Sequence, residues 1–207
     1  MSLRDLLLER SVVYRGWQAP FAAGKFAPVL EHNDLSRARR VLDVGCGPGT
    51  NTAMFAASDY YLGVDLNPKY VADARRRHRR EFVVGDAGQL DGRIDGTFDF
   101  ILVNSLLHHL SDAAAMRTLE SLPALLSDNG HVHILDLVRP PQFGVARLLA
   151  RADRGRYARP LAEWQAMFEA VFEPVVVEPY AFGLWRAPLW RMVYLKGGRR
   201  TAGETPS

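Results

Sequence analysis

The sequence contains one cysteine, Cys46, among its 207 residues. A single thiol cannot form an internal disulfide, which argues against a protein built for an oxidising compartment. A reactive thiol also needs an activating base or cation beside it, so we interpret Cys46 as a packing residue and not as a nucleophile.

Long hydrophobic runs are missing as well. No apolar stretch approaches the ~20 residues that a membrane-spanning helix needs. Arg4, Asp5, Glu9 and Arg10 interrupt the leucines at the start of the chain, and no apolar segment typical of a secretory signal follows them. The sequence therefore predicts a cytoplasmic protein with no membrane partner.

Lysine is scarce, and the net charge is small. Only three of the 26 lysine and arginine residues are lysines, and the net charge is +3. The one dense basic run, residues 75–80, lies where a helix is expected to end, and cations there complement the negative end of the helix dipole. No aromatic residues interleave with the run to stack on bases. We interpret it as a solvated helix end and expect no nucleic-acid partner.

Apolar segments of strand length alternate with helical patterns along most of the chain. The expected strands are residues 39–44, 60–66, 81–84, 98–104, 131–138, 175–179 and 189–196. The expected helices are residues 50–57, 68–78, 112–126, 142–158 and 160–172. This alternation predicts the α/β class, with a single doubly wound, mostly parallel seven-stranded sheet and helices on both faces. The last two strands are expected to form an antiparallel hairpin.

The length suits one domain, and no internal repeat or low-complexity segment divides it. Glycine and proline break the first 38 residues into short pieces. We expect an N-terminal helical lid or cap at residues 1–38, a Rossmann-like domain at residues 39–198 and a disordered polar tail at residues 199–207.

The most informative stretch is a glycine-rich loop after the first expected strand. It reads Val41-Leu42-Asp43-Val44-Gly45-Cys46-Gly47-Pro48-Gly49-Thr50. Glycine lets the backbone approach a ligand closely, and a strand, such a loop and a helix start hold nucleotide-like cofactors in doubly wound domains. The spacing is G-x-G-x-G, whereas dinucleotide sites have G-x-G-x-x-G. Asp43 adds a carboxylate that a pyrophosphate would not favour.

The pattern Asp-x-Gly-x-Gly-x-Gly resembles the first motif of the class I S-adenosylmethionine-dependent methyltransferases. The order of strands and helices over residues 38–196 resembles their fold. The resemblance, which is to the members that act on small molecules, implies an enzyme of class EC 2.1.1. It also implies S-adenosylmethionine as the cofactor and S-adenosylhomocysteine as the product.

Polar residues close successive expected strands, and open α/β sheets bind ligands beyond those carboxyl ends. Asp65 closes the second strand, where a carboxylate can accept hydrogen bonds from both hydroxyls of a ribose. By the family resemblance, Asp86 accepts the exocyclic amine of adenine and Ala87 offers its backbone N–H to a ring nitrogen. The cofactor-binding residues expected in all are Tyr14, Asp43, Gly45, Cys46, Gly47, Gly49, Asn51, Asp65, Leu66, Asp86, Ala87 and Asn104.

Two histidines follow the fourth expected strand. The segment 104–110 resembles the histidine-bearing loop of many small-molecule methyltransferases, which faces the transferred methyl group. An imidazole with a near-neutral pKa can deprotonate an attacking hydroxyl, so His109 or His108 is the expected catalytic base. The alternative is that the two rings only shape the loop.

Other candidate residues lie on the last third of the chain. His131 and His133 face the same side of the fifth expected strand, but no third ligand accompanies them, so no metal is expected. Phe182, Trp185 and Trp190 are candidates for an apolar acceptor pocket, whereas Trp164 is expected in the core.

The sequence predicts in-line transfer of a methyl group from the sulfonium to an oxygen, nitrogen or carbon atom of a small molecule, in secondary metabolism. The alternatives are an RNA methyltransferase, a nicotinamide oxidoreductase, and a protein of this fold that binds the cofactor without methyl transfer. The acceptor, the pathway, the use of a base, and the choice between a monomer and a homodimer are left open.

Overall fold

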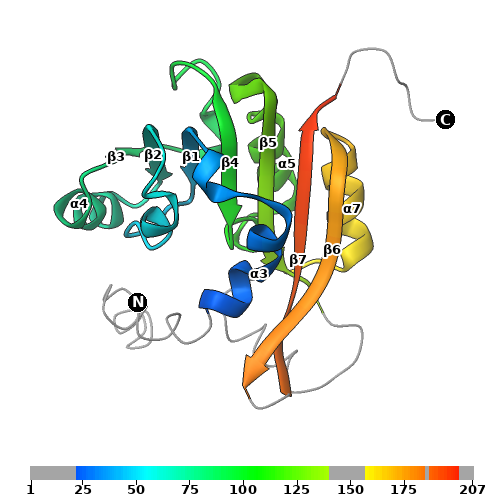
Figure 1. The fold of residues 1–207 in the computed structure, drawn as a ribbon. Coiled ribbons are helices and arrows are strands. Elements are labelled where there is room, and N and C mark those ends of the chain that lie inside the picture. The colour runs from blue at the N-terminus through cyan, green and yellow to red at the C-terminus, as the bar shows by residue number, and fades with distance from the viewer. Residues whose placement is uncertain (1–21, 140–156, 185–186, 201–207) are drawn as a thin grey trace, which may run out of the picture.

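The computed structural model describes residues 22–139, 157–184 and 187–200, and a sheet of seven strands forms its centre (Figure 1). The strands are β1 (Arg40–Val44), β2 (Tyr60–Asp65), β3 (Glu81–Val84), β4 (Phe98–Asn104), β5 (Leu126–Leu137), β6 (Phe172–Leu184) and β7 (Ala187–Arg199). Their order across the sheet is β3-β2-β1-β4-β5-β7-β6. The predicted α/β fold with a mostly parallel seven-stranded sheet is confirmed.

The order of the strands changes direction at β1. This strand pairs in parallel with β2 on one side and with β4 on the other, and β3 and β5 continue the sheet outward in the same orientation. Such a switch point is where doubly wound folds bind their ligands. At the far side of the sheet, β7 pairs antiparallel with both β5 and β6, as the predicted hairpin requires.

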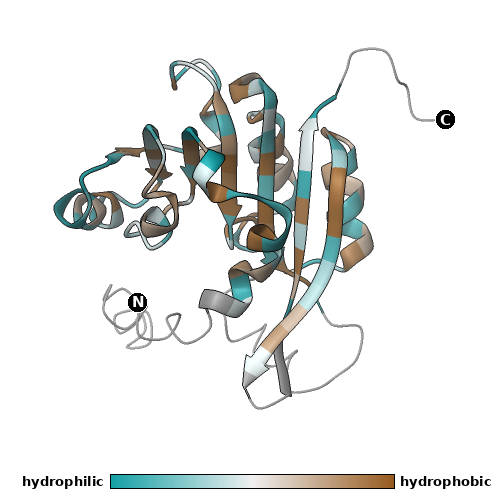
Figure 2. Cartoon of the chain, in the orientation of Figure 1, coloured by the Kyte–Doolittle hydropathy of each residue, from teal (hydrophilic) through white to brown (hydrophobic). Residues whose placement is uncertain are grey.

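In the described residues, helices pack against both faces of the sheet. The helices α3 (Ala22–His32) and α4 (Pro68–Arg77) supply buried side chains to one face. The helices α5 (Asp112–Glu120) and α7 (Leu161–Glu169) supply them to the other. Figure 2 shows hydrophobic residues concentrated on the central strands. Because strands covered on both faces are apolar along their whole length, the sequence predicts them well.

Three helices are shorter than the sequence predicts, and one of them, expected at residues 160–172, is α7 (Leu161–Glu169). The segment 50–57 forms only the 3₁₀ turn η3 (Thr52–Phe55). The helix expected to reach residue 126 ends at Glu120, because Pro123 has no N–H group and cannot continue it. The chain then passes through the turn η6 (Pro123–Leu125) directly into β5, whose pairing with β4 is irregular between Leu126 and His131. The helix expected at residues 142–158 falls almost wholly outside the described residues.

The terminal hairpin is longer than the sequence predicts. Pro174 and Pro179 interrupt the apolar pattern, yet both lie inside β6. They are tolerated because β6 is an edge strand, so one side of it has no neighbouring strand to receive hydrogen bonds. Met192 pairs with Leu137 at the end of β5, and the hairpin continues beyond this pair. It therefore extends past the carboxyl edge of the sheet (Figure 1).

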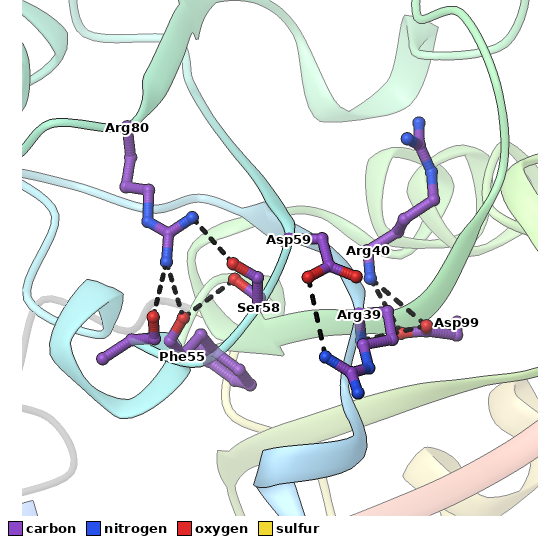
Figure 3. A network of polar contacts seen from close by, with 8 residues as sticks. Arg39, Arg40, Phe55, Ser58, Asp59, Arg80 and Asp99 are labelled. Atoms are coloured by element: carbon purple, nitrogen blue, oxygen red, sulfur yellow. Dashed lines mark hydrogen bonds and ion pairs between the residues drawn. The ribbon is translucent and has the colours of Figure 1, made fainter.

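Polar contacts within the protein close the amino edge of the sheet (Figure 3). Asp99 of β4 accepts hydrogen bonds from the backbone N–H groups of Arg39 and Arg40. The side chain of Arg39 pairs with Asp59 at 3.5 Å. These contacts fasten the beginnings of β1, β2 and β4 to one another, at the edge opposite the predicted ligand site.

The basic run at residues 75–80 lies mostly exposed at the end of α4, as predicted, and several of its side chains also contact the protein itself. Arg75 donates to the carbonyl of Phe82, and Arg76 and Arg77 pair with Asp73 at 2.9 Å. Arg80 donates to three carbonyls at the end of η3, those of Phe55, Ala56 and Ser58 (Figure 3).

The predicted domain limits at residues 38 and 198 stay predictions. Within the predicted lid, α3 packs on the sheet through Phe26 and Val29, both buried. Residues 1–21 of that lid and residues 201–207 of the predicted tail lie outside the described residues. In the part of the chain that the structure describes, no helix combines the length and apolar character needed to cross a membrane.

Candidate active site

The glycine loop lies directly after β1, at the switch point of the sheet. The N–H groups of Gly45 and Cys46 donate to the carbonyl of Val64 at 2.8 and 3.0 Å, which fastens the loop to the end of β2. Gly47 has a φ of +54°, and a Cβ atom placed on it would meet no atom within 4 Å. Bare backbone therefore borders open space here, as the glycine pattern predicts.

Cys46 and Gly49 belong to the packed side of this loop. Cys46 is 1% exposed, and burial raises the pKa of its thiol, which keeps it protonated. A Cβ atom on Gly49 would lie 2.7 Å from the ring of His78, so the loop rests against the segment after α4. Both residues therefore support the loop on its packed side, whereas Gly47 borders open space.

Asp65, at the end of β2, faces the glycine loop. Its Oδ2 atom accepts the N–H of Gly47 and its Oδ1 atom accepts the N–H of Asn67, both at 2.8 Å. A carboxylate offers about four acceptor positions, so these two bonds leave positions for the two hydroxyls of a ribose. The next residue, Leu66, is 69% exposed and offers an apolar surface against which an adenine ring can pack.

Asp86 and Ala87 lie beyond the end of the neighbouring strand, β3. The Oδ1 atom of Asp86 accepts the N–H of Gly88 at 2.9 Å and so caps the 3₁₀ turn η4 (Ala87–Gln89). The N–H of Gly85 donates to the carbonyl of Asp65 at 3.1 Å. The structure thus brings the loop after β1 and the two acids after β2 and β3 to adjacent strand ends.

Asp43 is fully buried in β1, and it contacts other parts of the protein. The hydroxyl of Tyr61 donates to its Oδ2 atom at 2.6 Å, and the amide of Asn51 donates to both oxygens at 3.1 and 3.3 Å. Burial raises the pKa of Asp43 to about 6, although these hydrogen bonds lower it in part. Asp43 orients Asn51 in this way, and direct contact with the cofactor stays a prediction.

Asn51 links Asp43 to Asn104 at the end of β4. The amide of Asn104 donates to the Oδ1 atom of Asn51 at 3.2 Å. The Oδ1 atom of Asn104 itself is buried, and no donor among the described residues reaches it. A buried acceptor without a donor costs about 1–3 kcal/mol, so a ligand N–H group would be stabilised there. The ammonium of an amino-acid ligand supplies such groups.

The two predicted catalytic histidines lie in the 3₁₀ turn η5 (Leu107–His109), and their surroundings differ. His108 is 1% exposed, and its Nδ1 atom lies 2.5 Å from Oδ1 of Asp136 in β5. Burial alone would raise the pKa of Asp136, but the charge of His108 and the hydrogen bonds to the carboxylate together lower it. Asp136 is therefore ionised and fixes the orientation of the His108 ring.

His109 is exposed, and its ring centroid lies 4.0 Å from that of His108. The turn begins after Ser105, whose φ of +54° is the one positive value at a non-glycine residue in the described ranges. This conformation costs about 1–3 kcal/mol and is typical of functional sites. Of the two predicted bases, His109 is the ring that an acceptor can reach in this conformation, whereas His108 is enclosed.

Two contributors to the site carry no recognisable motif. Arg159, which precedes α7 and is 3% exposed, donates to the carbonyls of Leu107 and Leu110 at 3.1 and 2.8 Å. These partners lie 52 and 49 residues away along the chain, so no local pattern indicates the contact. Tyr61, which holds Asp43, reads in the sequence only as one aromatic residue of an apolar strand.

The aromatic candidates separate into core and hairpin residues. Trp164 is 1% exposed, and its indole N–H donates to the carbonyl of Leu137 at 2.9 Å, so it belongs to the core as predicted. Phe182 and Trp190 stack with centroids 5.5 Å apart on the part of the hairpin beyond the carboxyl edge. Trp185 and Tyr14 lie outside the described residues.

His131 and His133 are the two histidines considered as metal ligands, and no third ligand joins them among the described residues. The Nδ1 atom of His133 lies 2.9 Å from the hydroxyl of Tyr194, and burial lowers the pKa of His133 well below its usual value. In the described residues, no group of three or more histidine, cysteine, aspartate or glutamate side chains is arranged to hold a metal ion.

These groups together fit S-adenosylmethionine. Asp65 and Asp86 are acceptors of the kind that a sugar and a base require, the Oδ1 atom of Asn104 is an acceptor of the kind that an ammonium requires, and Gly47 leaves room beside bare backbone. All of them lie at the carboxyl ends of β1 to β4, where this class of sheet binds ligands.

Comparison with known proteins points to the same class of cofactor. A family model described as "Methyltransferase domain" matches residues 41–130. Trans-aconitate 2-methyltransferase of Methylobacterium radiotolerans is 29% identical over 187 residues, which cover 81% of this chain and 66% of that protein. A tRNA (guanine-N(7)-)-methyltransferase of Burkholderia vietnamiensis is 28% identical over 163 residues, which cover 74% of this chain and 58% of that protein. The chain thus spans less than two thirds of the length of these curated relatives.

Solved structures share the fold. The N-methyltransferase NodS from Bradyrhizobium japonicum, crystallised with S-adenosyl-L-homocysteine, matches with a TM-score of 0.68 at 16% identity, over 88% of this chain and 89% of that one. The matched family model spans the glycine loop and the strand ends that carry Asp65, Asp86 and Asn104. Residues 41–130 therefore match a methyltransferase domain and the sheet has the fold of that class of enzymes, in agreement with the resemblance and with the S-adenosylmethionine cofactor that the glycine motif predicts.

Proposed function

We propose that this chain is an EC 2.1.1 enzyme that methylates an oxygen, nitrogen or carbon atom of a small molecule in secondary metabolism. The observation that carries the cofactor-binding part of the proposal is the buried Oδ1 atom of Asn104, which no described residue satisfies. It lies on a strand next to the one that carries the glycine loop, and Asp65 closes the strand on the other side. Each of these features matches a different part of the cofactor.

Different residues of the chain carry out binding and proton transfer. When bound, S-adenosylmethionine supplies a methyl carbon on a positively charged sulfur. The protein must hold the acceptor atom in line behind that carbon, about 3–3.5 Å away, with water excluded. Where the acceptor is a hydroxyl, the exposed ring of His109 takes its proton as the new bond forms. A neutral amine needs no base.

The contacts of the basic run favour a small acceptor over RNA. Arg75 and Arg80 donate to backbone carbonyls, and Arg76 and Arg77 pair with a carboxylate, so fewer of their N–H donors are available to phosphates. The tRNA methyltransferase among the relatives keeps RNA as the second candidate. Binding to RNA that weakens steeply with rising salt would favour that candidate, because each phosphate contact releases counterions.

Two measurements test the proposal. Titration calorimetry with S-adenosylhomocysteine should show one site per chain, and titration with NADH under the same conditions should show none. Methyl transfer from labelled S-adenosylmethionine is then followed against a panel of small hydroxyl, amine and activated-carbon acceptors, with tRNA as a further member. Heat of binding from NADH but not from S-adenosylhomocysteine would contradict the proposal.

A further inference from the structure

The turn η5 is held by buried charges of opposite sign on its two sides. On one side, Asp136 accepts the N–H of Leu107 at 2.8 Å and bonds the ring of His108. On the other side, Arg159 donates to the carbonyls of Leu107 and Leu110 at 3.1 and 2.8 Å. The carboxylate therefore satisfies donors of the turn, and the guanidinium satisfies its acceptors.

Arg159 also ties this turn to the segment before α7. Its backbone carbonyl accepts the N–H of Arg139 at 2.8 Å, and the N–H of Tyr157 donates to the carbonyl of His108 at 3.1 Å. The guanidinium carbon lies 4.7 Å from the ring centroid of Trp164, a core residue. The position of the guanidinium is thus fixed by the core, by the end of β5 and by η5 itself.

A contribution to folding stability does not by itself explain the buried guanidinium of Arg159. Burying a guanidinium carries a desolvation penalty of several kcal/mol, and apolar side chains of similar size often serve a core as well or better. Among the described residues, the carboxylate that pairs with Arg159 is that of Asp112 at 2.8 Å, and that side chain is 84% exposed. Such an exposed partner offsets little of the desolvation penalty, because water screens the ion pair. The forked guanidinium of Arg159 instead fixes the positions of two carbonyls, those of Leu107 and Leu110, at the two ends of η5.

We propose that Arg159 is a positioning residue for methyl transfer, which holds η5 so that His109 faces the acceptor. The inference rests on the proposed function, because η5 matters to the reaction only if an acceptor binds beside it. Among the described residues, the side chain of Arg159 contacts Asp112, Leu107, Leu110 and Trp164, and none of these is a cofactor residue or part of the glycine loop. Its loss should therefore disturb the acceptor side of the site and leave cofactor binding in place.

A matched pair of variants separates this role from ordinary packing. Arg159→Lys keeps the charge and removes the fork that reaches two carbonyls. Arg80→Lys makes the same change at the amino edge, where Arg80 also donates to carbonyls at the end of a 3₁₀ turn (Figure 3). Arg159→Met is a third variant, which removes the buried charge at similar length.

Amide hydrogen exchange measured along the whole chain is the first readout, and calorimetry with S-adenosylhomocysteine is the second. We expect Arg159→Lys and Arg159→Met to speed exchange at the amides of His109 and Leu110 by about tenfold or more, whereas Arg80→Lys leaves these amides unchanged. Affinity for S-adenosylhomocysteine should stay within about threefold in all three variants. With an acceptor identified, kcat should fall about 10- to 100-fold in Arg159→Lys while the KM for S-adenosylmethionine is unchanged.

Three outcomes would overturn the inference. If exchange in Arg159→Lys resembles that in Arg80→Lys, the guanidinium does not hold the turn. If both Arg159 variants lose protection in every strand, or fail to fold, the residue serves stability. If η5 loosens while kcat is unchanged, the turn does not place a reacting group. Failure of the proposed function is distinct, because the unmodified protein would then not bind S-adenosylhomocysteine.

Discussion

The Nδ1 atom of His108 and the Oδ1 atom of Asp136 lie 2.5 Å apart, and both side chains are almost wholly buried. Because Asp136 also accepts the N–H of Leu107, it holds the ring and the start of η5 together. The adjacent ring of His109 is exposed. This arrangement assigns different roles to two histidines that the sequence cannot distinguish.

Replacing each histidine in turn should separate those roles. His108→Ala leaves Asp136 buried without its partner, so the free energy of unfolding should fall by about 3–5 kcal/mol. His109→Ala should change it by no more than about 0.5 kcal/mol, as is usual for exposed positions. With a hydroxyl acceptor, His109→Ala should lower kcat about 10²- to 10⁴-fold. Urea unfolding and turnover measure the two effects, and equal losses of stability in both variants would contradict the assignment.

Asp65 gives the most direct test of the cofactor site. Asp65→Ala removes the carboxylate that faces the glycine loop, and affinity for S-adenosylhomocysteine should weaken by about 1.5–3 kcal/mol, the scale of hydrogen bonds to a charged group. Asp59→Ala is the control, because Asp59 lies at the amino edge and is exposed (Figure 3). Calorimetry should find the Asp59 variant unchanged. An unchanged affinity in Asp65→Ala would count heavily against the site.

Asn104 should affect binding more than stability. Asn104→Ala removes a hydrogen bond to Asn51 but also removes a buried oxygen that lacks a donor. These effects oppose each other, so the free energy of unfolding should change by less than about 1 kcal/mol. The affinity for S-adenosylhomocysteine should nevertheless fall about tenfold, because the acceptor for the ammonium is lost. Thermal unfolding and calorimetry on the same samples check both, and a loss of stability without a loss of affinity would assign Asn104 a structural role.

Asp43 predicts a specific dependence of stability on pH. Burial raises the pKa of Asp43 from 3.8 to about 6, so the folded protein binds this proton more tightly than the unfolded chain does. Its contribution to stability is fully present below pH 3.8 and is lost as the pH rises through about 6. The difference corresponds to about 3 kcal/mol.

Asp43→Asn cannot ionise and should remove this dependence. Asp136 acts in the opposite direction, because its pKa is lowered and its contribution is lost as the pH falls. Asp136 is present in both proteins, so the difference between the variant and the unmodified protein isolates Asp43. Urea unfolding from about pH 4 to 7 measures that difference. A difference that does not change with pH would mean that Asp43 titrates normally.

The sheet and its ligand edge could be predicted because their signals are local. Strands buried on both faces are apolar without interruption, and the residues that close them are polar. Asp43, Asp65 and the glycine loop are therefore visible in the sequence, and the structure places them at adjacent strand ends. The errors lie where context overrides the pattern, as at Pro174, which lies outside the expected strand 175–179 but which an edge strand accepts.

The supporting contacts of the site could not be predicted, because they join distant parts of the chain. Arg159 reaches carbonyls about fifty residues before it, and nothing near Arg159 in the sequence indicates them. The burial of His108 depends in the same way on Asp136, which is 28 residues away. Such contacts arise from tertiary packing, so the identity of a base and its supports becomes visible only in the folded chain.

Gly47 and Gly92 provide a matched test of the open space beside the loop. Both have a positive φ, +54° and +68°, and a Cβ atom on either would meet nothing within 4 Å. Alanine at either position strains the backbone alike, so each variant should lose about 1–2 kcal/mol of stability. Gly92 follows η4, in the connection that leads to the start of β4, whereas Gly47 lies in the loop that faces Asp65.

Only Gly47→Ala should impair cofactor binding, because its methyl group projects into the space that the cofactor needs. We expect affinity for S-adenosylhomocysteine to fall at least about tenfold in Gly47→Ala and to be unchanged in Gly92→Ala. Calorimetry and urea unfolding on the two variants separate strain from obstruction. If both variants bind the cofactor equally well, the open space beside Gly47 is not where the cofactor lies, and the site must be sought elsewhere along the carboxyl edge.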